Sequence, residues 1–362
     1  MRKVRVRLGS NGYNILIAPG LLRECGPTLI ESGFSGKVVV VTDPTVKSRY
    51  GDALNESLTA SGFKVAILDV PEGEEQKSLE RAARLYNELT NFYAERTTPL
   101  LALGGGVIGD LTGFVAATYL RGVPLVQIPT TLLAQVDSSI GGKVAVNHGS
   151  LKNKIGAFYQ PRLVLADINI LKTLPAGQLS DGLAEVIKYG VIGDADFFAY
   201  LERNLERIKA LDARALETVV YRSARIKARI VAKDERDFGL RITLNYGHTV
   251  GHAVETVSDF SVGHGQAVAI GMVAAARISN RLGVLGKSEV VRLKSLLSRA
   301  GLPTELPGLE LQKLIQTMKH DKKILQGKVR FVLPRAIGEV FITDEVSQSV
   351  IESVLVERNE ET

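Results

Sequence analysis

Blocks of apolar residues alternate with helix-like segments through the first half of the chain. Residues 1–8 alternate basic and apolar side chains, as a strand does, and residues 13–18 form a second apolar run. Further along, strand patterns at 37–43, 63–70, 99–103 and 163–167 are separated by helical patterns at 46–60 and 77–94. Strands that alternate with helices predict a doubly wound α/β layer with a mainly parallel sheet.

The second half of the chain reads mainly as helices. The pair Leu174-Pro175 marks the expected boundary, which predicts domains at 1–174 and 175–362. Apolar positions at helical spacing fall in 177–189, 195–206, 213–233, 244–257, 267–282, 288–300 and 310–319. A strand pair at 328–333 and 340–343 precedes a final helix. We therefore predict a helical second domain that carries one small strand pair.

Composition narrows the class of protein. The chain has 362 residues, 45% hydrophobic and 23% charged, which is typical of a globular protein with two cores. No apolar run reaches membrane-spanning length and no signal-peptide pattern begins the chain, so a cytoplasmic protein without a membrane partner is expected. Cys25 alone cannot form an internal disulfide and is expected to be buried. The net charge of +6 comes without a long basic run, which favours an anionic small molecule over nucleic acid.

Three of the five histidines lie close together in the sequence. His248 and His252 are four residues apart and His264 follows a short break, so a helix from residue 244 would place the first two on one face. Gly247 and Gly251 lower helix propensity there, which indicates that something packs closely against the backbone. Ordinary half-buried histidines are the alternative to a metal site.

A carboxylate that could complete a metal site occurs in the segment 182–190. Glu185 and Lys188 are three residues apart on an otherwise apolar helix, so a surface ion pair is the simple alternative. A buried carboxylate needs a cationic partner, and a divalent metal is one. We predict a metal site formed by Glu185, His248 and His264, with His252 left for proton transfer or as a hydrogen-bonded neighbour.

A glycine turn joins the strand at 99–103 to a helix that begins near residue 111. This order exposes backbone N–H groups and the positive end of a helix to a phosphate, although a plain tight turn would have the same sequence. Asp43 ends an earlier strand, where it could bind a ribose hydroxyl or cap a helix. The long polar stretch 128–157, with Lys143 and Lys152, is expected to be an irregular binding loop.

A second set of polar residues points to a multiply charged substrate. The set consists of the segment 320–323, with the sequence His-Asp-Lys-Lys, together with Lys188, Lys227, Arg241 and Asn245. Several cations near a metal favour a substrate with both a carboxylate and a phosphate.

These motifs resemble 3-dehydroquinate synthase of the shikimate pathway over essentially the whole chain. The resemblance is carried by the segments 71–78, 104–110, 129–131, 137–143, 152–158, 182–190 and 239–255. It implies a lyase that needs NAD and Zn²⁺ or Co²⁺ and converts 3-deoxy-D-arabino-heptulosonate 7-phosphate into 3-dehydroquinate and phosphate. It also implies a homodimer whose N-terminal domain is Rossmann-like. The implied route is transient oxidation, phosphate elimination, re-reduction, ring opening and intramolecular aldol closure.

The resemblance also implies roles for individual residues. For NAD it indicates Asp43, Glu74, Lys77, Gly105, Gly106, Val107, Asp110, Thr130, Thr131, Lys152, Ile170, Leu171, Lys172 and Thr173. For substrate it indicates Arg121, Asp137, Lys143, Asn153, Lys188, Lys227, Arg241, Asn245 and Lys322. For catalysis it indicates His252, Lys143, Asn153, Lys188 and Asp237, the last standing where the family usually has glutamate. The metal ligands it implies are the three residues already named.

Three alternatives stay open at this point. Another sugar phosphate cyclase would share most of these motifs. A metal- and NAD-dependent polyol dehydrogenase of related architecture would release NADH and would not need the cationic set. A nucleotide-binding regulatory protein without activity would not need the Glu/His/His set.

Overall fold

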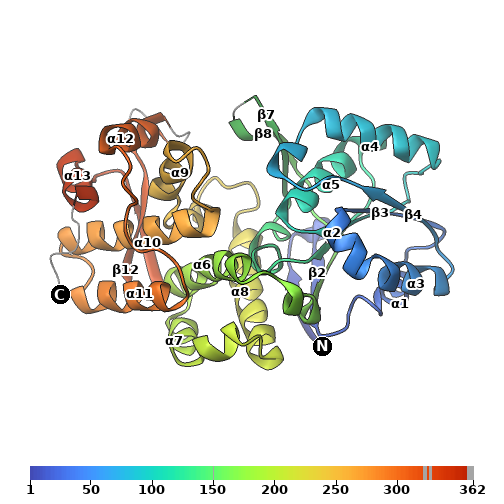
Figure 1. Cartoon of the computed structure of the whole chain (residues 1–362), viewed down its shortest axis with the longest axis horizontal. Coiled ribbons are helices and arrows are strands. Elements are labelled where there is room, and N and C mark those ends of the chain that lie inside the picture. Colours follow the sequence, from blue (N-terminus) through green and yellow to red (C-terminus); the bar gives the residue numbers. More distant parts are fainter. Residues whose placement is uncertain (150, 321–323, 326–327, 357–362) are drawn as a thin grey trace. The chain divides into compact units, whose positions relative to one another are not determined.

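A computed structural model describes residues 1–149, 151–320, 324–325 and 328–356. The chain forms two compact units, Met1–Pro175 with Ala213–Glu235 and Ala176–Asp212 with Arg236–Thr362. Figure 1 labels their elements. The chain leaves the first unit next to the expected boundary, but helix α8 (Ala213–Lys233) returns to that unit, which the division into 1–174 and 175–362 did not anticipate. Helix α8 packs on β1 and β2. Its sequence pattern indicates that one face of the helix is apolar but does not indicate which elements that face contacts.

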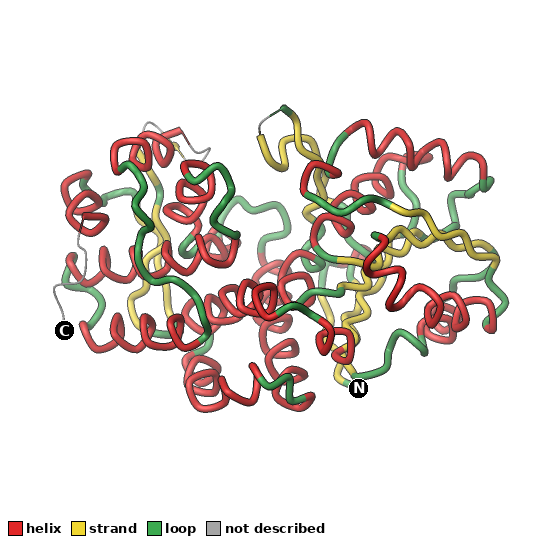
Figure 2. Tube along the Cα trace, viewed as in Figure 1, coloured by secondary structure: helices red, strands yellow, loops and turns green. Residues whose placement is uncertain are grey.

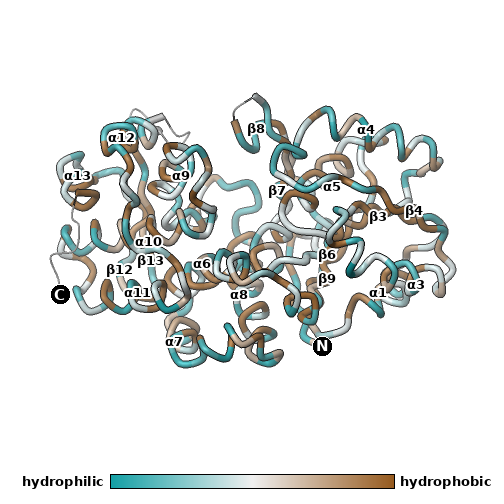
Figure 3. The backbone as a smooth tube through the Cα atoms, in the orientation of Figure 1, coloured by the Kyte–Doolittle hydropathy of each residue, from teal (hydrophilic) through white to brown (hydrophobic). Residues whose placement is uncertain are grey.

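The first unit is built on a seven-stranded sheet in the order β1-β2-β9-β6-β5-β3-β4. Its strands are β1 (Arg2–Val6), β2 (Tyr13–Ala18), β3 (Lys37–Thr42), β4 (Lys64–Asp69), β5 (Leu100–Gly104), β6 (Leu125–Pro129) and β9 (Leu163–Asp167). Only β1 runs antiparallel to its neighbour, so the predicted mainly parallel sheet is confirmed. Figure 3 colours β3 and β4 brown, as expected for strands covered on both faces.

Alternate side chains of each strand enter two separate cores. Val38 and Val40 face a core that includes Cys25 and residues of α3, whereas Val39 and Val41 face a core that includes residues of α4 and α5. The helices of this unit are α1 (Cys25–Glu31), α2 (Pro44–Val46), α3 (Asp52–Ala60), α4 (Leu79–Asn91) and α5 (Gly106–Thr118), with α8 from the later segment. Burial raises the pKa of the Cys25 thiol to about 12, which confirms the expected buried cysteine.

The stretch predicted as an irregular loop contains regular structure. It begins with β6, includes one π-helical turn, η5 (Ala134–Ser138), and then forms an antiparallel hairpin of β7 (Lys143–His148) and β8 (Leu151–Phe158). The prediction of a long irregular loop was therefore wrong. Glycine and polar residues hid the strands because hairpin strands with an exposed side need no continuous apolar run.

The second unit consists of helices around a small antiparallel strand pair (Figure 2). Its helices are α6 (Ala176–Gly193), α7 (Ala195–Lys209), α9 (His248–Val257), α10 (His264–Arg281), α11 (Lys287–Arg299), α12 (Leu311–His320) and α13 (Gln348–Val356). The predicted strand pair is confirmed as β12 (Phe331–Ala336) with β13 (Glu339–Thr343), and shorter strands β10 (Ile324–Leu325) and β11 (Lys328–Val329) precede it. In the part of the chain that the structure describes, no helix is both long and apolar enough to cross a membrane.

The start of α9 lies against α10 because both backbones carry glycine at the contact. A Cβ atom on Gly271 would lie 1.8 Å from the carbonyl oxygen of Gly247, so only glycine fits there. Gly247 has φ +80°, a left-handed conformation, and is the N-cap of α9, two residues after the 3₁₀ turn η7 (Leu240–Asn245) ends. The expected helix from residue 244 therefore begins four residues later. The close backbone approach inferred from the glycines is confirmed, and α10 is the element that makes it.

Candidate functional site

Glu185 lies at the centre of a polar cluster in the second unit. Its side chain is 0% exposed, and its carboxylate contacts the ammonium group of Lys188, which is 2% exposed. Helix α6 buries most of its residues from Leu179 to Ile192, so the alternative of a solvated ion pair is excluded. Burial without compensation would make this carboxylate costly, so its cationic surroundings are needed for stability.

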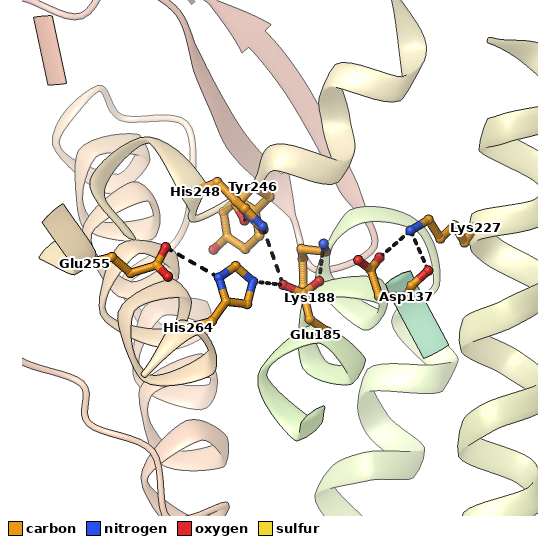
Figure 4. Close-up of polar contacts among 8 residues, drawn as sticks. All are labelled: Asp137, Glu185, Lys188, Lys227, Tyr246, His248, Glu255 and His264. Atoms are coloured by element: carbon orange, nitrogen blue, oxygen red, sulfur yellow. Dashed lines mark hydrogen bonds and ion pairs between the residues drawn. The ribbon is translucent and has the colours of Figure 1, made fainter. Parts of the chain in front are cut away.

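Two histidines approach the same carboxylate oxygen. Oε1 of Glu185 lies 3.5 Å from Nε2 of His248 and 3.4 Å from Nε2 of His264, as Figure 4 shows. His248 is the first residue of α9 and His264 the first of α10, so the glycine contact between these helices brings the two rings together. Among the described residues, these three form a group whose ligand atoms lie within 4.8 Å of one another.

The other ring nitrogen of each histidine has a partner that fixes the ring. Nδ1 of His248 lies 3.1 Å from the backbone oxygen of Tyr246, and Nδ1 of His264 lies 3.4 Å from Oε2 of Glu255. With a proton held on each Nδ1, loss of the proton from Nε2 gives the tautomer that binds a metal, and each Nε2 is on the side of Glu185. Burial lowers the pKa of His264, but hydrogen bonds and charge attraction from Glu185 and Glu255 outweigh it and raise the pKa to about 10.

This donor set fits a divalent transition metal. Two donors on a tetrahedral ion with bonds of roughly 2.0–2.1 Å lie about 3.3 Å apart, close to the separations of 3.4 and 3.5 Å between Oε1 of Glu185 and the two Nε2 atoms. Two imidazoles and one carboxylate also match catalytic sites that keep a position open for substrate or water. His252 lies outside the set and faces His248 edge-on, with ring centroids 5.2 Å apart.

The glycine turn of the first unit lies at the switch point of the sheet. The chain moves from β3 outward to β4 and then returns to the other side of β3 as β5, so the carboxyl ends of β3 and β5 flank the crevice where such sheets bind ligands. Gly104 ends β5, and a Cβ there would lie 2.6 Å from Cβ of Ile108. Gly105 caps α5, whose first N–H groups therefore point toward the same crevice.

Asp43 follows β3 on the opposite side of this switch point. Its side chain accepts a 2.8 Å hydrogen bond from the N–H of Val46 at the start of α2, so the capping interpretation is observed. Burial raises the pKa of the Asp43 carboxyl, and the Val46 N–H partly opposes that rise. Capping uses one oxygen and is compatible with a ribose contact by the other.

The ammonium group of Lys77 contacts several residues that are expected to bind nucleotide or substrate. It is 4% exposed, and its Nζ donates to Oδ2 of Asp110 at 2.9 Å and to Oδ1 of Asn153 at 2.6 Å. Glu74 lies 3.7 Å from the same nitrogen. Burial lowers the pKa of Lys77, but Asp110 and Glu74 outweigh it and raise the pKa, so the ammonium is charged.

The remaining expected nucleotide residues follow other strands of the sheet. Thr130 and Thr131 come directly after β6, and residues 170–173 lie in the 3₁₀ segment η6 (Ile168–Thr173) after β9. Val107 is in the first turn of α5, and Lys152 is exposed on β8. Most of the expected set is thus at the carboxyl edge of one parallel sheet.

The expected substrate residues divide between the two units. In the first unit, Nζ of Lys227 on α8 donates to the carboxylate of Asp137 at 2.7 Å and to its backbone oxygen at 2.8 Å (Figure 4). Arg121 and Lys143 are exposed there, as is Asn153. In the second unit, Arg241 is 2% exposed, whereas Asn245 and Asp237 are half-buried. Lys322 lies outside the described residues.

Sequence reasoning missed two polar residues of these clusters. Glu255, 8% exposed, holds the ring of His264, and Asn147 contacts both Glu74 and Asn153. A buried carboxylate on the histidine helix could have been noticed from the apolar spacing of 250–254. Nothing in the sequence indicated Asn147, because its contacts depend on the hairpin.

Solved structures of similar fold define the class of this protein. ValA (2-epi-5-epi-valiolone synthase) from Streptomyces hygroscopicus subsp. jinggangensis 5008, with NAD⁺ and Zn²⁺ bound, matches with a TM-score of 0.89 at 29% identity over 98% of both chains. A 2-deoxy-scyllo-inosose synthase complexed with carbaglucose-6-phosphate, NAD⁺ and Co²⁺ matches with a TM-score of 0.89 at 27% identity, covering 98% of this chain and 99% of the other. The fold is that of the sugar phosphate cyclases.

Sequence comparison narrows this class to one family. Family models for the N-terminal and C-terminal parts of 3-dehydroquinate synthase match residues 67–181 and 182–324. The 3-dehydroquinate synthase of Desulforamulus reducens is 52% identical over 98% of this chain and 99% of its own length. The chain belongs to the 3-dehydroquinate synthase family, which confirms the resemblance inferred from its motifs.

Proposed function

We propose that this chain converts 3-deoxy-D-arabino-heptulosonate 7-phosphate into 3-dehydroquinate and phosphate, with NAD and one divalent metal, Zn²⁺ or Co²⁺. The observation that carries the proposal is family membership over 98% of the chain. The Glu/His/His cluster adds chemical support, because it matches the donor set of a catalytic metal site.

We assign Glu185, His248 and His264 as the metal ligands. Bound there, the metal would polarise a substrate hydroxyl, while NAD would accept a hydride and return it within one turnover. Glu185 supplies a negative charge from a fully buried position, and the glycine contact between α9 and α10 orients the two imidazoles before ligand arrives. We assign to His252, whose ring lies beside that of His248, the transfer of a proton at the reacting centre.

We assign the crevice between β3 and β5 to NAD. The N-terminus of α5 would bind the pyrophosphate through backbone N–H groups, and Asp43 would accept a hydrogen bond from a ribose hydroxyl. Glu74, Lys77 and Asp110 would orient the nucleotide, because their mutual ion pairs fix their side chains. The threonines after β6 and residues 170–173 complete the set at the same edge.

We assign the cationic residues to the substrate's carboxylate and phosphate. Lys227 is ordered by Asp137, which lowers the entropy cost of holding an anion nearby. Lys188 and Arg241 are almost fully buried, where a cation binds an anion more strongly than it does in water. Further hydrogen bonds to the substrate would come from Arg121, Lys143, Asn153 and Asn245. Asp237 has a carboxylate where the family usually has glutamate, on a side chain that is shorter by one methylene.

One assay tests this proposal. Purified protein with catalytic NAD⁺ and Zn²⁺ or Co²⁺ is given the heptulosonate phosphate, and phosphate release and dehydroquinate formation are followed. We expect equal amounts of both products without accumulation of NADH, because the hydride returns to the same substrate.

Two outcomes would favour the alternative enzymes. Accumulation of NADH with a simple polyol would indicate a dehydrogenase. Faster phosphate release from a different phosphorylated sugar than from the heptulosonate phosphate would indicate another sugar phosphate cyclase.

We also propose a cytoplasmic homodimer without nucleic-acid or membrane partners. The resemblance of the motifs supports the dimer, and the moderate charge of +6 without a long basic run supports the absence of nucleic acid. Light scattering should give twice the chain mass of 39.1 kDa, and a value for a single chain would contradict the proposal.

A further inference from the structure

Asn147 lies at an irregularity in the β7–β8 hairpin. The strands pair Val146 with Ile155 and His148 with Leu151, and the register shifts between these two pairs. One residue of β7, Asn147, therefore lies opposite residues 152–154 of β8, so the extra residues of this bulge are on β8. The bulge contains Asn153, whose backbone N–H reaches the side chain of Asn147.

Both ends of the Asn147 side-chain amide have partners. Nδ2 donates to the Glu74 carboxylate at 2.9 Å and to the Glu74 backbone oxygen at 3.3 Å. Oδ1 accepts a 2.9 Å hydrogen bond from the backbone N–H of Asn153. The backbone N–H of Asn147 also donates to the oxygen of Lys77 at 2.7 Å. One residue thus contacts two expected nucleotide residues and one expected substrate residue.

Asn153 is held from two sides as a result. Asn147 binds its backbone N–H, and Lys77 binds its side-chain oxygen at 2.6 Å. Asn153 has φ +55°, a left-handed conformation that costs free energy in a residue other than glycine and persists only when contacts hold it. These two hydrogen bonds are the contacts that hold it.

We propose that Asn147 is a positioning residue that couples the nucleotide site to the substrate site by holding Glu74, Lys77 and Asn153 in one arrangement. Its amide is suited to this role because it has a donor toward Glu74 and an acceptor toward Asn153. Aspartate would keep the acceptor, lose the donor and place a second carboxylate beside Glu74. The role in turnover rests on the proposed function, whereas the coupling between Glu74 and Asn153 does not.

Two variants separate the halves of this arrangement. Asn147→Ala removes both contacts, and Asn147→Asp removes only the contact to Glu74. Asn91→Ala, at an exposed position at the end of α4, is the matched control. The measurements are NAD⁺ affinity by calorimetry, hydrogen exchange of peptides covering 143–158, and kcat and KM for the heptulosonate phosphate.

The expected results differ between the variants. Asn147→Ala should weaken NAD⁺ binding about tenfold, speed exchange in the hairpin and lower kcat about tenfold or more with a smaller change in KM. Asn147→Asp should weaken NAD⁺ binding to a similar extent while hairpin exchange stays near that of the unchanged protein. Asn91→Ala should match the unchanged protein in all three measurements.

Other results would overturn the proposal. Unchanged NAD⁺ affinity in both variants would remove the link to Glu74, and unchanged hairpin exchange in Asn147→Ala would remove the link to Asn153. If Asn147→Ala does not fold, unchanged NAD⁺ affinity in Asn147→Asp is decisive against the coupling. Failure of the unchanged protein to release phosphate would refute the proposed function alone, because NAD⁺ affinity and hairpin exchange still decide the coupling.

Discussion

The contact between Gly247 and Gly271 makes a prediction about the metal site. In Gly271→Ala, the new Cβ would lie 1.8 Å from the carbonyl oxygen of Gly247 and 2.9 Å from the backbone nitrogen of Gly251. Both atoms belong to the backbone at the start of α9, so no side-chain rotation can relieve the overlap. The start of α9 has to move away from α10.

The size of this movement follows from the overlap. Ordinary contacts begin at 3.4 Å, so the shortfall is 3.4 − 1.8 = 1.6 Å. Metal–ligand distances tolerate changes of only about 0.2 Å, and His248 and His264 lie at the starts of the two helices that separate. We expect the affinity for Zn²⁺ to fall at least tenfold, and overpacking to lower the free energy of unfolding by about 1–3 kcal/mol.

The assay compares this variant with a glycine in open space. A Cβ on Gly177, in α6, would meet no atom within 4 Å, so Gly177→Ala should keep the affinity and gain at most about 1 kcal/mol of stability. Zn²⁺ affinity is measured by competition with a chromophoric chelator, and stability by urea unfolding of the metal-free protein. If Gly271→Ala retained both the Zn²⁺ affinity and the unfolding free energy of the unchanged protein, the glycine contact could not be what brings the histidines together.

Three further predictions concern charged groups. Glu255→Gln should weaken Zn²⁺ binding about 10- to 100-fold, because His264 loses its carboxylate partner. The control Glu305→Gln, at an exposed position, should leave the Zn²⁺ affinity unchanged. If the two variants bound Zn²⁺ equally tightly, the role of Glu255 would be refuted. Since the pKa of His264 in the folded protein is raised from 6.5 to about 10, protonation stabilises the metal-free protein fully below pH 6.5, and this stability is lost as the pH rises toward 10. Co²⁺ titrations at pH 7 and 8 should therefore show an apparent affinity that rises about tenfold per pH unit as the His264 proton is expelled, and a pH-independent affinity would contradict this. Lys227→Met should lower kcat/KM at least about tenfold and the free energy of unfolding by about 1–3 kcal/mol, because it removes the ion pair of this buried lysine with Asp137. Lys209→Met, which removes an exposed ion pair with Glu206, should change neither quantity. A fully active Lys227→Met variant would exclude Lys227 from substrate binding.

The sequence predicted the parts of the fold that depend on periodicity. The apolar run at 37–43 and the strand before the glycine turn identified β3 and β5, and therefore a parallel sheet with its ligand edge. The amphipathic pattern of 213–233 identified α8 as a helix but did not indicate that it packs with the first compact unit. Periodicity describes which face of a helix is apolar, whereas the partner of that face depends on the rest of the fold.

The candidate metal cluster was predictable because its residue types are rare in apolar surroundings. A glutamate on an apolar helix and histidines near glycine pairs could be grouped without coordinates, and the structure brings all three together. The groups that hold the histidine rings could not be predicted as fully. One of them is the backbone oxygen of Tyr246, and because every residue has a backbone oxygen, the sequence does not distinguish this one. Asn147 was missed because its contacts with Glu74 and Asn153 exist only once β7 and β8 have paired.

The return of α8 to the first unit has a consequence for how the protein folds during synthesis. Strands β1 and β2 are among the first residues made, yet the helix that packs on them ends at Lys233. About two thirds of the chain must therefore leave the ribosome before the first unit can close its packing, and α6 and α7 emerge before the later helices of their own unit. An N-terminal fragment that stops at residue 175 would leave an apolar surface without its cover, so neither half of this chain can be obtained in native form by a single cut.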